Sequence, residues 1–167
     1  QGLVEACDIS AKRLSKMGAR LTRSGADIVR SHVLGEEGKD WFAEHQSGYD
    51  RVLVDAPCSG SGTWRRDPLA KWRLRPKDLD AHITQQTEIL RQAALLVKSG
   101  GRLIYVTCSL LAREGEDQIE KFLAATPEFK VMNVEQLWPK ISSMPFPGPG
   151  PFLRLSPAKT GTDGFFI

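Results

Sequence analysis

The sequence lacks any long apolar run, and this absence excludes a helical membrane protein. No stretch approaches the roughly 20 consecutive apolar residues that a helix needs to cross a bilayer. Residues 1–8 contain neither a basic segment nor an apolar core of the kind that marks a secretory signal. We therefore expect a cytoplasmic protein that has no membrane partner.

Cysteine is scarce, and its pattern excludes two further classes of protein. The chain has 3 cysteines, Cys7, Cys58 and Cys108. An odd and widely spaced set does not form a disulfide framework and is typical of a reducing compartment. The sequence contains no Cys-x-x-Cys pair and no closely spaced histidine pair, so we expect no metal site.

The remaining composition, 41% apolar and 26% charged over 167 residues, is that of one globular domain over residues 1–167. Strand patterns are predicted at residues 3–8, 27–34, 49–56, 102–108 and 129–137, and residues 35–48 read as irregular. Helices are predicted after Ser10, over 77–98 with Gly100 and Gly101 as its stop, and over 114–125. Residues 144–151 alternate proline and glycine and form a loop, while 152–167 read as a hairpin. This alternation predicts an α/β fold with a mostly parallel sheet and a C-terminal antiparallel hairpin.

Reactive side chains follow several predicted strands, where ligands bind in parallel sheets. Asp8, Asp55 and Cys108 stand at strand ends, and Cys58 lies just beyond one. We predict that Cys58 and Cys108 share one site with Asp55, while Cys7 is buried in the core away from it. A tight turn with an incidental cysteine is the simpler alternative for Cys58.

A basic segment with two tryptophans follows Cys58. Interleaved cations and aromatic rings suit contact with phosphates and stacking on bases, so we predict a nucleic-acid surface. The alternative is a solvated loop whose tryptophans cover the core. The residues of the predicted surface are Arg65, Arg66, Lys71, Trp72 and Arg73.

Three motifs together resemble one family. They are Asp55-Ala-Pro-Cys58-Ser-Gly-Ser-Gly, Thr107-Cys108-Ser109 and Gly161-Thr-Asp163-Gly-Phe-Phe. In this order they are similar to the RsmB/NOP (Sun) family of RNA cytosine-5 methyltransferases. The resemblance implies a Rossmann-like methyltransferase fold, S-adenosylmethionine as cofactor, and cytosine in RNA, ribosomal RNA above all, as acceptor.

The resemblance also implies roles for single residues. Cys108 matches the nucleophile that adds to cytosine C6, and Cys58 matches the second cysteine, which assists product release. The resemblance places Asp55 at the junction of cofactor and target base. Asp8 matches the acid that binds the cofactor ribose.

The chain departs from the family pattern in three places. The family's first strand, with its glycine-rich cofactor loop, would precede Gln1, so we expect an N-terminally incomplete domain with two unpaired strand edges. The family's acid after the third strand is missing, and Glu36 or Glu37 is its nearest substitute. Glu114-Gly115-Glu116 stands where the family usually has a central asparagine. We interpret these acids as favourable to the dipole of the helix that they begin.

Two other functions remain open from the sequence. A DNA cytosine-5 methyltransferase would use Cys58 as its nucleophile and leave Cys108 unexplained. A catalytically silent RNA-binding module would keep the fold without the reaction, but it would not need two cysteines at strand ends.

Overall fold

A computed structural model of the chain describes residues 2–35 and 38–167. Glu36 and Glu37, the expected substitutes for the family's acid, lie outside the described residues. The chain divides into two compact units, Gln1–Gln46 and Ser47–Ile167, so the single domain over 1–167 stays a prediction. Within the part described, no helix is both long and apolar enough to cross a membrane.

The first unit pairs two parallel strands, β1 (Val4–Asp8) and β2 (Val29–Val33). Between them, the predicted helix after Ser10 is divided into α1 (Ala11–Ser15) and α2 (Gly18–Ser24). Ser10 begins α1 as expected, because its side chain accepts a hydrogen bond from the backbone N–H of Arg13. Residues 35–48 are not wholly irregular as predicted: they contain α3 (Gly38–Glu44).

The prediction that Cys7 is buried in the core is wrong, because Cys7 is exposed. It lies within β1, whose only hydrogen-bonded neighbour in the described part of the chain is β2. An apolar strand pattern predicts burial on both faces, but it does not show whether other elements cover both faces.

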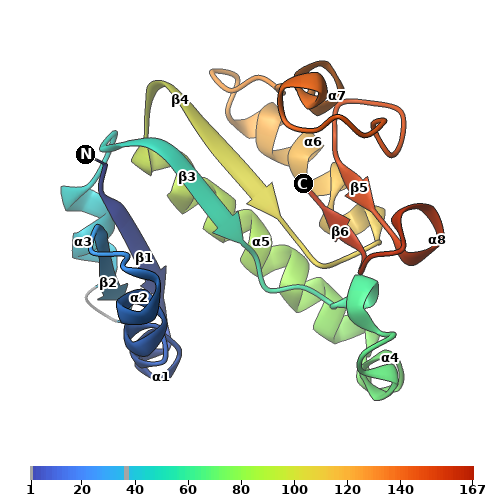
Figure 1. The fold of residues 1–167 in the computed structure, drawn as a ribbon, viewed down its shortest axis with the longest axis horizontal. Helices are drawn as coiled ribbons and strands as arrows, with labels where there is room; N and C mark the ends of the chain where they lie inside the picture. Colours follow the sequence, from blue (N-terminus) through green and yellow to red (C-terminus); the bar gives the residue numbers. More distant parts are fainter. Residues whose placement is uncertain (1, 36–37) are drawn as a thin grey trace. The chain divides into compact units, whose positions relative to one another are not determined.

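The second unit is built on two parallel strands joined by a long helix, as Figure 1 shows. The strand β3 (Tyr49–Asp55) is followed by a 3₁₀ turn, η1 (Ser61–Thr63), and by the helix α4 (Pro68–Arg73). The long helix α5 (Pro76–Leu96) comes next and is followed by β4 (Val97–Val106). α5 packs on both strands. The remaining elements are η2 (Ala112–Glu114), α6 (Glu116–Ala125), α7 (Val134–Leu137), η3 (Trp138–Lys140), β5 (Arg154–Leu155), α8 (Pro157–Thr160) and β6 (Phe165–Phe166). β5 and β6 form the expected antiparallel hairpin.

Two predicted boundaries in this unit are wrong. α5 ends at Leu96, before the expected glycine stop, because Val97 is already extended and begins β4. The strand predicted over 129–137 is absent, and its second half is the short helix α7. Asn133 begins that helix by accepting a hydrogen bond from the backbone N–H of Gln136, a local interaction that outweighs the apolar pattern.

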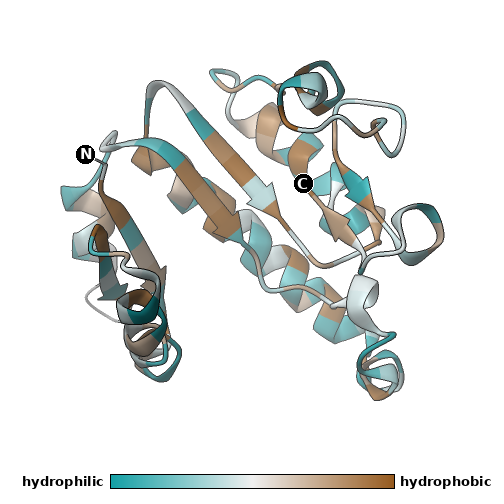
Figure 2. Ribbon diagram, in the orientation of Figure 1, coloured by the Kyte–Doolittle hydropathy of each residue, from teal (hydrophilic) through white to brown (hydrophobic). Residues whose placement is uncertain are grey.

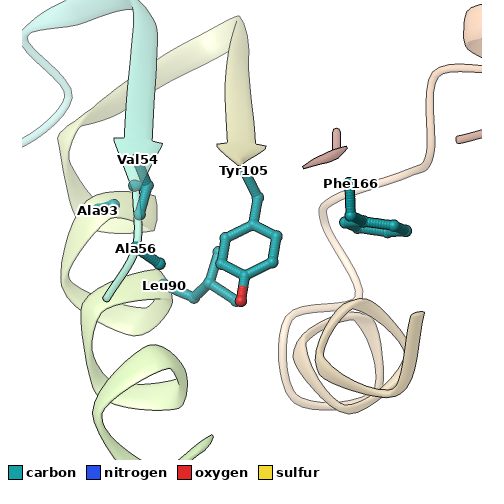
Figure 3. Packing of buried hydrophobic residues seen from close by; sticks show 6 residues of the cluster. All are labelled: Val54, Ala56, Leu90, Ala93, Tyr105 and Phe166. Atoms are coloured by element: carbon teal, nitrogen blue, oxygen red, sulfur yellow. The ribbon is translucent and has the colours of Figure 1, made fainter. Parts of the chain in front are cut away.

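The core of this unit lies between the strands, α5 and the C-terminal hairpin. Hydrophobic residues run along β3, β4 and α6 (Figure 2). Figure 3 shows the six buried side chains that form the cluster, which come from β3, the residue after it, α5, β4 and β6: Val54, Ala56, Leu90, Ala93, Tyr105 and Phe166.

The two strand edges expected to lack partners are found. Within the residues described, β1 is paired with β2 alone and β3 with β4 alone, so each has one edge free of a neighbouring strand. On β3, the side chain of Leu53 is 66% exposed, although its neighbour Val54 is part of the core. Proteins usually cover or blunt an open, apolar sheet edge, because its unpaired backbone groups can pair with another chain.

Candidate active site

The parallel pairing of β3 and β4 brings the two cysteine loops together. Asp55 lies opposite Val106 in the register, so both strands end at the same edge of the sheet. Cys58 follows β3 by three residues and Cys108 follows β4 by two. Their sulfur atoms are 3.4 Å apart, within hydrogen-bond distance. The predicted proximity of these two thiols is confirmed.

The contact makes the two thiols chemically different. The hydrogen bond from Cys58 lowers the pKa of Cys108 to about 7, against the opposing effects of partial burial and of the negative charges of Asp55 and Glu114. The same hydrogen bond raises the pKa of Cys58, and burial adds to that rise. These opposite shifts favour Cys108 as the sulfur that ionises first and Cys58 as the thiol that donates to it. A thiolate is the nucleophilic form of cysteine.

The two aspartates singled out in the sequence are in different surroundings. Asp55 is exposed at the end of β3, and its charge acts on Cys108. Asp8 ends β1 in the other unit. Its carboxylate accepts hydrogen bonds from the backbone N–H of Ser10 at 2.8 Å and from the Arg13 guanidinium at 3.4 Å. Asp55 therefore lies near enough to Cys108 to act on its pKa, whereas the roles predicted for Asp55 and Asp8 stay predictions.

Glu114 is the residue of this site that the sequence interpretation placed wrongly. It belongs to η2, before α6 begins, and it is completely buried. Its carboxylate accepts hydrogen bonds from the backbone N–H of Ser59 at 2.9 Å and from the Ser59 hydroxyl. It also accepts from the hydroxyl of Ser109 at 2.7 Å and from the side-chain amide of Gln86 at 3.1 Å. A helix-dipole role does not explain this burial. The sequence offered one signal of this role, the serine that follows each cysteine. A serine hydroxyl that is buried needs a hydrogen-bond acceptor, and a carboxylate is such an acceptor.

The C-terminal hairpin closes the other side of the two loops. Phe166 and Thr107 exchange backbone hydrogen bonds of 3.0 and 2.9 Å. Gly62 donates its N–H to the carbonyl of Cys108 at 3.0 Å and accepts from the N–H of Gly164 at 2.8 Å. A Cβ on Gly62 would lie 2.2 Å from the Gly164 carbonyl oxygen, so the two backbones approach as closely as only glycine allows.

The predicted RNA-binding residues divide into two groups. Arg65 and Arg66 both form ion pairs with the buried carboxylate of Asp163, although their own side chains are 65% and 72% exposed. The second group is Lys71, Trp72 and Arg73 on α4. Trp72 is 81% exposed, and the Lys71 ammonium lies 5.8 Å from the centre of its ring. Trp72 therefore does not cover the core.

Comparison with known proteins decides the family. The sequence profile described as 16S rRNA methyltransferase RsmB/F matches residues 1–167. The chain belongs to the RsmB/F family. Its curated relatives include ribosomal RNA small subunit methyltransferase B of Salmonella paratyphi B and of Salmonella newport. Each is 41% identical over 125 residues, which are 75% of this chain and 29% of the relative. The chain thus spans less than a third of the length of these relatives.

Solved structures agree with the RsmB/F assignment. A structure titled PH0851 superposes with a TM-score of 0.84 at 35% identity, covering 99% of this chain and 36% of the other. A methyltransferase homologue from Pyrococcus horikoshii superposes with a TM-score of 0.73 at 25% identity, covering 99% of this chain and 52% of that one. The Rossmann-like methyltransferase fold expected from the sequence is confirmed.

Proposed function

We propose that this RsmB/F-family chain carries the active site of an RNA cytosine-5 methyltransferase that modifies ribosomal RNA with S-adenosylmethionine. The main support is the 3.4 Å contact between the sulfur atoms of Cys108 and Cys58, in which the pKa of Cys108 is lowered and that of Cys58 is raised. C5 of cytosine is a poor nucleophile, and a thiolate is the group that can activate it.

Cys108 begins the reaction. Its thiolate adds to C6 of the cytosine, and the electrons of the C5–C6 double bond move into the ring to give an enamine. Asp55 ends β3 beside the two cysteine loops, where the resemblance to the family puts it at the junction of cofactor and target base. S-adenosylmethionine, when bound, supplies the electrophilic methyl group that C5 takes.

Cys58 completes the reaction. Once Cys108 is bonded to C6, its sulfur no longer accepts the Cys58 proton, and the largest cause of the raised pKa of Cys58 is removed. Cys58 then loses its proton to solvent and, as a thiolate, removes the proton from C5. The C5–C6 double bond re-forms, and Cys108 leaves as a thiolate.

The cofactor assignment has support of its own. A solved structure of NSun6 from Pyrococcus horikoshii, 24% identical with a TM-score of 0.75 over 100% of this chain and 40% of that one, is titled as containing SFG, an analogue of S-adenosylmethionine. The Asp8 carboxylate fits a ribose, since a carboxylate has about four acceptor sites and two protein donors occupy it here. Asp8 would therefore hold the ribose hydroxyls.

RNA is the substrate that suits the basic segment. On α4, an exposed tryptophan beside Lys71 and Arg73 provides a stacking surface next to phosphate-binding charges. The target cytosine must leave its stack to reach two sulfur atoms at once, so single-stranded or flipped RNA is expected.

Two cysteine variants test the proposal. With 16S rRNA and labelled S-adenosylmethionine, Cys108→Ala should abolish both methylation and the covalent protein–RNA complex. Cys58→Ala should instead accumulate that complex, because release is the step that fails. The reverse pattern would support the DNA-type arrangement, in which Cys58 attacks. All of these variants are made in the full-length protein, and binding of RNA without methylation by the unmodified full-length protein would point to a silent module.

A further inference from the structure

The two cysteine loops meet through a buried polar network rather than through apolar packing. On one side, Ser59 follows Cys58. On the other, Ser109 follows Cys108, and both serines are bonded to the carboxylate of Glu114. Glu114 has an exposed fraction of 0% and Ser109 of 2%. The carboxylate of Glu114 therefore links the two loops whose sulfur atoms are 3.4 Å apart.

α5 holds the carboxylate in turn. The amide of Gln86, also completely buried, donates to Glu114 at 3.1 Å and to the carbonyl of Pro57 at 2.9 Å. Gln118 of α6 donates to the Gln86 side chain at 3.3 Å. A carboxylate with four donors from three different segments is fully satisfied, and such a network fixes the position of its members.

We propose that Glu114 is the positioning residue of the active site, holding the loops after β3 and β4 so that the Cys58 thiol faces the Cys108 sulfur. The role rests on the proposed function, in which this sulfur pair performs the chemistry. Glu114 touches no reacting atom and acts through Ser59 and Ser109. Its own negative charge opposes thiolate formation, so its contribution is one of geometry.

Glu114 affects the pKa of Cys108 in two ways, through its charge and through the position of Cys58. The two effects have opposite signs, and this makes the proposal testable. Cys58, Asp55 and Glu114 are the ionisable groups that act on the Cys108 thiol. Removing the negative charge of Glu114 lowers the pKa of Cys108. Loss of the hydrogen bond from Cys58 raises it, because that bond is the main cause of the low value. A positioning role therefore predicts a rise in Glu114→Gln, and a purely electrostatic role predicts a fall.

The experiment follows alkylation of Cys108 by iodoacetamide against pH, with peptide mass spectrometry to isolate this one thiol. In the unmodified chain the midpoint should lie at about pH 7. In Glu114→Gln it should move toward the ordinary cysteine value of about 8.5, which lowers the thiolate fraction at neutral pH by up to roughly 15-fold. The exposed Glu120→Gln on α6 is the matched control and should leave the midpoint unchanged.

Further variants separate the possible outcomes. In a Cys58→Ala background, Glu114→Gln should produce no rise, because the bond it maintains is already gone. Ser109→Ala keeps the charge of Glu114 and should raise the midpoint as well, which preserves the test if Glu114→Gln does not fold. An unchanged or lowered midpoint in folded Glu114→Gln or Ser109→Ala would overturn the positioning role.

Methyl transfer gives a separate readout. Glu114→Gln should lower kcat with little change in KM for RNA, since no RNA contact is altered. Alkylation requires neither cofactor nor RNA. A shifted midpoint in a chain that never methylates cytosine would refute the proposed function and leave the positioning role standing. Normal methylation by the unmodified protein, with an unshifted midpoint in Glu114→Gln, would refute the positioning role and leave the proposed function standing.

Discussion

Alanine at Gly62 should disturb the active site and the stability of the second unit together. The new Cβ would lie 2.2 Å from the carbonyl oxygen of Gly164, and this oxygen is backbone that cannot rotate away. Forcing extra atoms into close packing costs about 1–3 kcal/mol. At roughly 2–4 °C per kcal/mol for a chain of this size, the midpoint of thermal unfolding should fall by roughly 2–12 °C.

The same change should also affect Cys108, the proposed nucleophile. Gly62 donates to the Cys108 carbonyl at 3.0 Å, so a shift of the Gly62 backbone moves the loop after β4. We expect slower alkylation of Cys108 at neutral pH in addition to the lower melting temperature. Thermal denaturation followed by circular dichroism, together with the alkylation rate, measures both effects.

Gly18→Ala is the matched control with the opposite sign. Gly18 begins α2 and has no atom within 4 Å of its would-be Cβ, so alanine should stabilise the helix by up to about 1 kcal/mol. If Gly62→Ala melts at or above the temperature of the unmodified chain and alkylates at the same rate, the close approach of the hairpin is not what holds this loop.

The remaining predictions concern the sulfur pair, the basic helix α4 and Asp8, the proposed ribose-binding acid. Diamide should join Cys58 and Cys108 in a disulfide that reducing agents reverse, since sulfurs 3.4 Å apart need only a short movement to reach the S–S bond length of about 2.05 Å. A product linked through Cys7 instead would contradict this geometry. Neutralising Lys71 and Arg73 should flatten the salt dependence of single-stranded RNA binding by a slope of up to roughly 1.4, and an unchanged slope would mean that α4 is merely solvated. Asp8→Ala should weaken S-adenosylmethionine binding roughly tenfold or more in calorimetry, since hydrogen bonds to a charged group contribute about 1.5–3 kcal/mol, while equal affinity would remove Asp8 from the ribose site.

Features of this protein that depend on local pattern could be predicted from the sequence. The strand that ends at Asp55 is found within one residue of its predicted bounds, and the strand before Cys108 covers most of its predicted range, because short apolar runs indicate strands directly. Parallel pairing of these strands then follows from the helix between them, and with it the proximity of the two cysteines. The motifs at the strand ends were sufficient to indicate the family.

Which side chains are covered, and which come into contact, could not be predicted from local patterns. Cys7 is exposed because its strand has a single hydrogen-bonded partner within the described residues, and no local pattern reports how many partners a strand has. Asp163 forms ion pairs with Arg65 and Arg66 from about a hundred residues away, whereas Lys71 and Arg73 of α4 form no ion pair within the part of the chain that the structure describes. Glu114 reads as a helix-starting acid in sequence, yet it is buried between two loops. Its four hydrogen bonds come from segments that only the folded chain brings together.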